Sequence, residues 1–240
     1  MKKLRTVVQY ECVTSFKYIW IFYAVVFAVI AVISAIIFLV EGSLELVGTN
    51  CLEVNSLVYV GILGALGFKE DFRMLIQNGF TRKYIFIATL SMFGFISGTM
   101  ALVDAVVGNL MYHINNNYFS VYGAIYGYDN IFMNWLWLFL LYVTFCCLLY
   151  LIVLVINKVG KKASIYLAVV FGGIILLIIA LFRYVFTAEI VGNILEFLMK
   201  AMGFMADGTI NYIFPALTLF VLATILGTGS YAIIRRTELK

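Results

Sequence analysis

Charged residues divide this chain into six long apolar runs, and no polar segment between them is long enough to form a core of its own. A membrane-spanning helix needs about 20 apolar residues. Only 12% of the residues are charged, about half the share of a soluble domain. The sequence therefore predicts an all-α integral membrane protein, residues 1–240 forming a single transmembrane domain with spans near 18–40, 52–68, 84–112, 132–156, 163–187 and 212–234.

Basic residues set the expected orientation of these spans. With six spans, 14 of the 16 Lys and Arg residues fall on one side: Lys2, Lys3, Arg5, Lys17, Lys69, Arg73, Arg82, Lys83, Lys158, Lys161, Lys162, Arg235, Arg236 and Lys240. The opposite loops carry mainly acids, including Glu41, Glu45 and Glu53. Because basic loops remain in the cytoplasm, both termini are predicted to be cytoplasmic.

The first 16 residues are predicted to form a separate helix on the cytoplasmic membrane surface. Leu4, Val7, Val8 and Cys12 share one helical face, and the basic residues point elsewhere. This is the pattern of a basic interfacial helix over residues 2–16. The alternative is a frayed polar tail.

The segment 188–211 is too apolar for an open loop, and its charges at Glu189, Glu196 and Lys200 make it a poor further span. We expect a pair of short helices, broken at Gly203 or Gly208, that re-enters the membrane from outside between spans five and six. Irregular backbone at that depth must be shielded by protein, so this segment should pack against the bundle.

The link between the second and third spans has the pattern of a helix followed by a stop. Apolar residues recur there with the spacing of one helical face, at Phe68, Phe72, Leu75 and Ile76. Acidic residues stand at its start, where the helix dipole favours anions. Asn78 and Gly79 tolerate the left-handed conformation that ends a helix, and Thr81 can cap the next one. The sequence predicts a short amphipathic helix over 69–78 and a tight turn into span three.

Motifs for catalysis, metal binding and nucleotide binding are missing. His113 is the single histidine, so multi-histidine metal sites are excluded and a serine nucleophile would have no other base. A Walker A motif is also missing, and any nucleotide energy must come from another polypeptide. Gly61, Gly64 and Gly67 lie inside a span and are interpreted as helix packing. We expect no catalytic residue, metal ligand, bound cofactor or nucleic-acid partner for this chain.

Asp104 is the carboxylate that lies well inside a predicted span. An ionisable residue inside a membrane is by default a functional hypothesis, here a proton-relay group or a contact lining a substrate path. The alternative is a structural role, in which Asp104 is neutral or hydrogen-bonded between helices, with Asn109 or Tyr112 as partners.

In layout the chain resembles the permease subunit of a type-2 ABC exporter, of the small peptide- or drug-exporter kind found in Gram-positive bacteria. That family is similar in its six spans, its N-terminal interfacial helix, its cytoplasmic coupling helix between spans two and three, and its external re-entrant pair before span six. The detailed resemblance covers residues 68–83, FKEDFRMLIQNGFTRK, an acidic helix ending in a Gly-x-Ser/Thr-Arg turn.

The resemblance implies partners and a role for this string. Two permease chains, identical or homologous, would form the path in the bacterial plasma membrane, each docked on a separate ATPase subunit that binds ATP and Mg²⁺. The cargo would be amphipathic or hydrophobic, such as a peptide, drug or lipid-like molecule. The residues implied to couple ATP-driven closure to the membrane are Lys69, Glu70, Asp71, Phe72, Arg73, Leu75, Ile76, Gly79, Thr81 and Arg82.

The sequence is also compatible with a second class of function. The chain would then be a stand-alone membrane protein without an ATPase, either an immunity or assembly factor or a small secondary carrier that relies on Asp104. Secondary carriers often contain internal repeats, and no repeat relates spans one to three to spans four to six.

Overall fold

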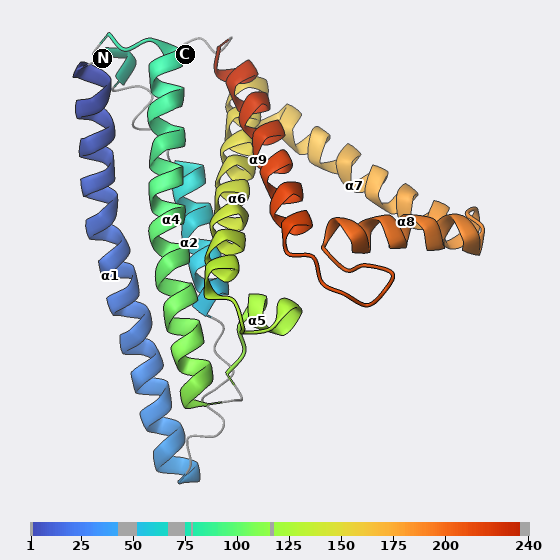
Figure 1. Cartoon of the computed structure of the whole chain (residues 1–240). Helices are drawn as coiled ribbons and strands as arrows, with labels where there is room; N and C mark the ends of the chain where they lie inside the picture. Colours follow the sequence, from blue (N-terminus) through green and yellow to red (C-terminus); the bar gives the residue numbers. More distant parts are fainter. Residues whose placement is uncertain (1, 43–51, 67–74, 78, 116–117, 236–240) are drawn as a thin grey trace.

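The computed structural model describes residues 2–42, 52–66, 75–77, 79–115 and 118–235, and this part of the chain is largely helical (Figure 1). Its helices are α1 (Lys2–Glu41), α2 (Leu52–Leu66), α4 (Arg82–Ile114), α5 (Val121–Tyr126), α6 (Ile131–Val159), α7 (Lys161–Tyr184), α8 (Ala188–Ala201) and α9 (Ile213–Ile234). Five of these described helices are long and apolar enough to cross a membrane: α1, α4, α6, α7 and α9. The prediction of an all-α, multi-pass membrane protein is confirmed at this level.

The helix at the second predicted span, α2, is shorter than a membrane crossing requires. Its 15 residues rise about 22 Å, whereas about 20 residues are needed to cross the hydrocarbon. The residues on either side of α2 lie outside the described part of the chain. Six crossing helices therefore stay a prediction.

The separate interfacial helix predicted over residues 2–16 is wrong. Residues Lys2–Glu41 form one helix of 40 residues, because no glycine or proline separates the polar first part from the apolar second part. Both parts pack on the bundle: Val7 contacts the core, and Ile19 and Tyr23 are almost fully buried. Packing along one continuous face holds α1 beside α4 (Figure 1).

The centre of the bundle is α6, which contacts α2, α4, α7 and α9. α6 and α2 lie close together, since a Cβ added at Gly64 would lie 2.8 Å from the carbonyl oxygen of Cys146. A Cβ added at Gly61 would meet the side chains of Phe145 and Leu149 at 2.6 and 2.8 Å. The prediction that these two glycines serve helix packing is confirmed, and Gly67 lies outside the described residues.

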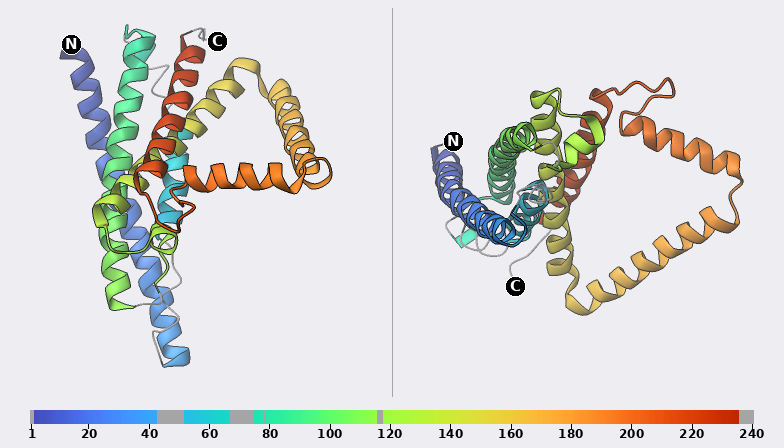
Figure 2. Two further views of the ribbon diagram at one scale, coloured as in Figure 1. Left: turned by 45° about the vertical axis from the view of Figure 1, so that its right-hand side comes forward. Right: turned by 90° about the horizontal axis from the view of Figure 1, so that it is seen from below.

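Helices α7 and α8 form an arm that leaves the bundle at the end of α6 and returns to it at α9 (Figures 1 and 2). α8 has no buried residue, and α7 is exposed along most of its length. The predicted break at Gly203 is confirmed, since this residue has φ +91° and its N–H donates to the Lys200 carbonyl at 2.9 Å.

The predicted helical pair in 188–211 is wrong in its second half. Past Gly203 the backbone forms a turn in which Phe204 and Ile210 make a β-bridge. Two features there oppose a helix. Gly208 has φ +80°, and the Asp207 carboxylate accepts the N–H and the hydroxyl of Thr209 at 3.1 and 2.7 Å. α8 contacts α9 of the bundle.

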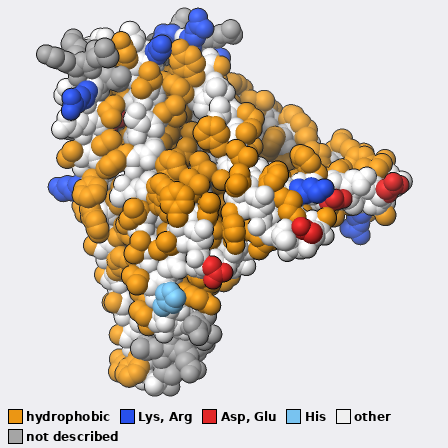
Figure 3. All heavy atoms as spheres, viewed as in Figure 1, with side chains coloured by type: hydrophobic (Ala, Val, Ile, Leu, Met, Phe, Trp, Pro, Cys, Tyr) orange, Lys and Arg blue, Asp and Glu red, His pale blue; other side chains and the backbone are white. Residues whose placement is uncertain are grey.

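The start of α1 and the end of α9 lie at the same end of the bundle (Figure 1). Lys and Arg side chains gather on this end, which we call the basic end (Figure 3). Here the Arg82 guanidinium donates to the carbonyl of Arg235 at 2.8 Å, so the first residue of α4 is tied to the last turn of α9.

Candidate functional site

The strongest candidate site is a buried polar cluster around Asp104. Asp104 is 0% exposed, and each of its oxygens accepts a hydrogen bond from a tyrosine on another helix. The Tyr23 hydroxyl of α1 donates to Oδ1 at 2.8 Å, and the Tyr142 hydroxyl of α6 donates to Oδ2 at 2.6 Å. Ser56 of α2 lies 3.4 Å from the Tyr23 hydroxyl. Asp104 therefore joins α4 to α1 and α6, and Tyr23 brings α2 into the same cluster.

The contact partners of Asp104 differ from those expected within its own helix. The Asn109 amide donates to the Ala105 carbonyl at 3.3 Å, and the Tyr112 ring stacks on Tyr128 with centroids 3.7 Å apart. The structural alternative is correct that Asp104 is hydrogen-bonded between helices. The partners expected for it, Asn109 and Tyr112, are wrong.

A second buried carboxylate, Glu53, lies next to this cluster in the first turn of α2. It is 4% exposed, so its prediction as a loop residue is wrong. One of its oxygens accepts the Ser120 hydroxyl at 2.7 Å, and the other accepts the N–H of Val121. These groups form the N-terminus of α5, where a negative charge is favourable. Glu53 therefore holds α5 against α2.

Tyr142 and Tyr126 connect these elements to the arm. The Tyr142 hydroxyl lies 3.4 Å from the Glu53 carbonyl, in addition to its bond with Asp104. On α5, the Tyr126 hydroxyl donates to the Met202 carbonyl at 2.8 Å. The ring of Tyr126 stacks on that of Phe204, with the ring centroids 5.9 Å apart. A continuous series of contacts thus runs from Asp104 through Glu53 and α5 to the end of α8.

The cluster can accommodate Asp104 with or without a proton. A tyrosine hydroxyl has one proton to donate, and both tyrosines have a second acceptor, the Met100 carbonyl at 3.1 Å from Tyr23 and the Glu53 carbonyl at 3.4 Å from Tyr142. As a carboxylate, Asp104 accepts from both phenols. As a carboxylic acid, it can donate to one of the two tyrosine hydroxyls. That hydroxyl then donates its own proton to the backbone carbonyl beside it, which is Met100 for Tyr23 and Glu53 for Tyr142.

Within the described residues, the cluster contains neither a set of metal ligands nor a salt bridge to Asp104. No group of three or more His, Cys, Asp or Glu side chains there could hold a metal ion. The salt bridge found in the same residues lies on α8, where Lys200 contacts Glu196 at 2.8 Å. In this arrangement Asp104 is held by phenols and not by a cation.

An apolar cavity of about 150 Å³ lies between α1 and α4, beyond the Asp104 cluster. Its lining consists of Phe27, Ile30, Ser34, Leu52, Val107, Met111 and Tyr118. A cavity of this volume takes one small apolar molecule of about the size of benzene. It can therefore hold one or two apolar side chains, or the end of an acyl chain, of a larger molecule.

The predicted coupling residues are only partly described. Lys69, Glu70, Asp71, Phe72 and Arg73 lie outside the described residues, whereas Leu75, Ile76, Gly79, Thr81 and Arg82 lie within them. Leu75 is 3% exposed, and Ile76 packs on the same core. A partner protein therefore cannot contact Leu75 directly, and this side chain can act only by anchoring the turn.

The predicted helix stop at Asn78-Gly79 is confirmed by the backbone of Gly79. Its φ is +76° and its N–H donates to the Ile76 carbonyl at 2.9 Å, while the Phe80 N–H donates to the Leu75 carbonyl at 3.0 Å. These two bonds are the hydrogen-bond pattern that ends many helices at a left-handed glycine. Thr81 occupies the N-cap position of α4, but its side chain makes no capping hydrogen bond.

The sequence did not identify Tyr23, Tyr142 and Ser56 as members of the Asp104 cluster, and it placed the neighbouring Glu53 in a loop. An uncharged tyrosine or serine inside an apolar run gives no signal of its own. The signal that could have identified Glu53 is its position at the first turn of an apolar run, where a carboxylate has to be either solvated or paired.

Comparisons with protein-family models, with curated proteins and with solved structures found no match for this chain.

Proposed function

We propose that this chain is the membrane-spanning permease subunit of an ATP-driven ABC exporter in a bacterial plasma membrane. Both termini would be cytoplasmic, six helices including α2 would cross the membrane, and α8 would lie in the outer leaflet. A second permease chain and a separate pair of ATPase subunits, which bind ATP and Mg²⁺, complete the transporter. The cargo is amphipathic or hydrophobic.

The observation that carries this proposal is the turn between Leu75 and Arg82. Leu75 anchors it in the core, Gly79 ends the preceding helical turn, and α4 begins at Arg82 without a linker. Because Arg82 also bonds the end of α9, a force applied to residues 69–78 would move two apolar helices together. Asp104 lies on the same α4 and would transmit this movement to α1 and α6 through Tyr23 and Tyr142.

The test is co-purification with the ATPase after mild detergent extraction. The wild-type chain should bring down an ATPase in stoichiometric amount, and the double variant Glu70→Lys with Arg73→Glu should lose at least nine-tenths of it. A matched control reverses another pair of charges, Glu196→Lys with Lys200→Glu, which exchanges the two ends of the α8 ion pair. The proposal is wrong if no ATPase accompanies the wild type, or if both double variants retain it equally.

A second candidate, a stand-alone secondary carrier, is favoured by the buried Asp104 and its ability to be satisfied with or without a proton. In this case the chain alone, reconstituted in liposomes, should move protons with its substrate. Asp104→Asn should abolish that movement while the protein stays folded. Transport that needs ATP and an ATPase, and that survives Asp104→Asn, would exclude the carrier.

A further inference from the structure

The cavity of about 150 Å³ between α1 and α4 is lined by apolar side chains and by two residues with a hydroxyl group, Ser34 and Tyr118. The Ser34 hydroxyl donates to the Ile30 carbonyl at 2.8 Å, so Ser34 requires no polar ligand. An apolar cavity of this volume takes a molecule of about six carbon atoms. The cavity therefore fits an apolar group, or the end of a longer apolar chain.

The cavity reaches the surface of the protein. Met111, which lines it, is 39% exposed, and the lining residues Phe27 and Val107 are half-buried. The neighbouring side chains on the outer faces of the two helices are apolar and at least 40% exposed: Val29, Ile33, Val106 and Leu110. A large apolar surface of this kind is rarely left in water, and on a multi-pass membrane protein it is covered by lipid. The molecules at the mouth of the cavity are therefore acyl chains.

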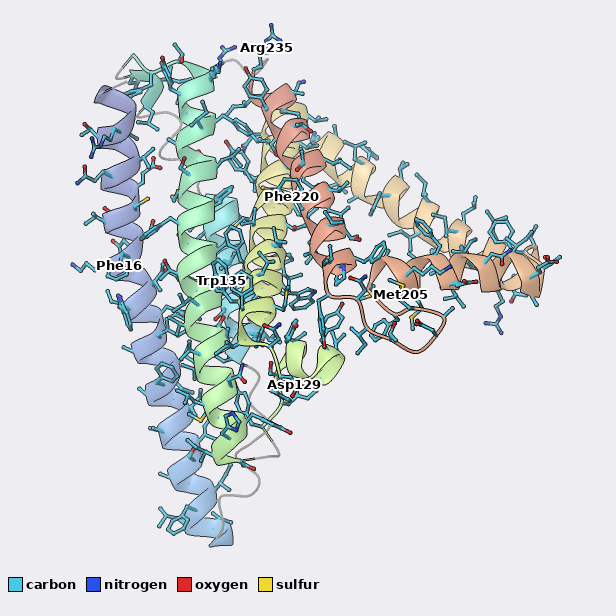
Figure 4. The ribbon with its side chains drawn as sticks, viewed as in Figure 1. Phe16, Asp129, Trp135, Met205, Phe220 and Arg235 are labelled. Atoms are coloured by element: carbon cyan, nitrogen blue, oxygen red, sulfur yellow. The ribbon has the colours of Figure 1, made fainter. Side chains whose placement is uncertain are left out.

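The position of the cavity along α1 agrees with the depth at which acyl chains end. Residues 18–40 carry no charge, and they rise about 34 Å, close to the hydrocarbon thickness of about 30 Å. Phe27 and Ile30 stand near the middle of this uncharged run, where the chains of the two leaflets meet. Figure 4 places Phe16 about halfway along α1, so the uncharged run is the half of α1 away from the basic end.

The cavity also adjoins a contact that holds α1 to α4. Phe27 lies one turn from Tyr23, and their rings stack with centroids 5.9 Å apart. Val107 lies one turn from Asp104, which accepts the Tyr23 hydroxyl at 2.8 Å. Side chains that line a cavity gain dispersion contacts when a ligand of matching shape fills it. An acyl chain here would therefore strengthen the packing of α1 on α4 beside the Tyr23–Asp104 bond.

We propose that this cavity binds the end of an acyl chain of a bilayer phospholipid, and that the bound chain completes the packing of α1 on α4. The site requires only that the chain spans a membrane, and it involves neither an ATPase nor cargo. It goes beyond the proposed function because it makes a lipid of the surrounding bilayer a specific ligand next to Asp104.

Photo-labelling in vesicles tests the site. The chain is reconstituted in phosphatidylglycerol vesicles that contain a phospholipid with a diazirine at the end of one acyl chain, and the adducts are mapped by mass spectrometry after illumination. Leu52 lines the cavity but is 2% exposed, so a lipid reaches it only from within the cavity. We expect adducts on Leu52. They should fall about five-fold or more in Val107→Phe, which fills the cavity, and persist in Val106→Phe, the matched control on the outer face of α4.

A second pair of variants makes the result independent of the folding of Val107→Phe. Ser34→Leu fills the cavity from α1 and should also reduce the adducts on Leu52, whereas Ala35→Leu, at an exposed position, should not. Val170 on α7 is 58% exposed, and its adducts should stay equal in all variants that insert correctly.

The thermal midpoint in detergent measures the effect on packing. Adding phosphatidylglycerol should raise the midpoint of the wild type and of Val106→Phe more than that of Val107→Phe, in which the new ring replaces the acyl chain. The site is wrong if Leu52 carries no adduct while Val170 does, which would mean that protein fills the cavity. It is also wrong if the Leu52 adducts persist in both cavity-filling variants, and equal midpoint shifts in all variants would contradict the effect on packing.

Discussion

The phenol oxygen of Tyr142 lies 2.6 Å from Oδ2 of Asp104, and this contact joins α6 to α4 in the interior of the bundle. Tyr23 from α1 occupies the other carboxylate oxygen at 2.8 Å. A hydrogen bond to a charged group contributes about 1.5–3 kcal/mol, and a buried acceptor left without a donor costs about as much. Asp104 is therefore a point where three helices depend on each other.

Removing the hydroxyl of Tyr142 should destabilise the protein because Oδ2 of Asp104 then has no hydrogen-bond donor. We expect Tyr142→Phe to cost about 2 kcal/mol, seen as a lower thermal midpoint in detergent, and Tyr23→Phe to behave similarly. The matched control is Tyr166→Phe on α7, whose side chain is 73% exposed. Equal midpoints for Tyr142→Phe and Tyr166→Phe would contradict the role of the contact.

Glu53 should control the order of α5 more than the stability of the whole bundle. Glu53→Ala removes the acceptor for the Ser120 hydroxyl and the Val121 N–H, a capping loss of about 1–2 kcal/mol. Amide exchange over residues 121–126 should then speed up by about ten-fold or more, while exchange in α4 changes little. Glu196→Ala is the control, and α5 exchange that is no faster in Glu53→Ala than in this control would rule out the cap.

Local patterns in the sequence predict the local structure well. The apolar runs locate most long helices, and the turn signals at Gly79 and Gly203 locate two helix ends. The continuity of α1 was missed because the charge of Lys17 was interpreted as a membrane boundary. A charge does not interrupt a helix when the backbone on both sides of it favours one.

The site could be predicted only in part. Asp104 stands out as a carboxylate inside an apolar run, but its partners Tyr23 and Tyr142 lie 81 and 38 positions away. Such pairs depend on how α1, α4 and α6 pack, and helical periodicity relates only residues within a few turns. For this reason the sequence suggested residues of the same helix, Asn109 and Tyr112, as hydrogen-bond partners of Asp104.

Gly79 should resist substitution because of its backbone conformation and not because of crowding. Its φ is +76°, yet an added Cβ would meet nothing within 4 Å. Gly79→Ala should cost about 1–2 kcal/mol. Gly94 on α4 has the same open surroundings in a helical conformation, so Gly94→Ala should be neutral or stabilise by up to about 1 kcal/mol. Thermal midpoints that move in the same direction for both variants would contradict this explanation.

The turn between α8 and α9 should be sensitive to acid. The hydroxyl and the N–H of Thr209 bond the Asp207 carboxylate and lower its pKa below the ordinary value of 3.8. A lowered carboxyl pKa stabilises the folded turn above that ordinary value and ceases to do so as the pH falls through the lowered pKa. Exchange of the Thr209 amide, corrected for its intrinsic pH dependence, should therefore speed up below about pH 4. Asp207→Asn should remove this step, and a step that persists in the variant would assign it to another group.

Alanine should lower the free energy of unfolding by different amounts at Gly64 and at Gly61, although both residues lie where α2 meets α6. A Cβ at Gly64 would lie 2.8 Å from the carbonyl oxygen and 3.0 Å from the Cα of Cys146, whereas a Cβ at Gly61 would meet only side-chain atoms of Phe145 and Leu149. Side-chain ends can turn away, but backbone atoms move only if the helices separate. We expect Gly64→Ala to cost about 2–3 kcal/mol and Gly61→Ala about 1 kcal/mol. Gly172→Ala on α7, where an added Cβ would meet nothing within 4 Å, is the control. Thermal midpoints in the order Gly172→Ala, Gly61→Ala, Gly64→Ala from highest to lowest would support this packing, and a lower midpoint for Gly61→Ala than for Gly64→Ala would contradict it.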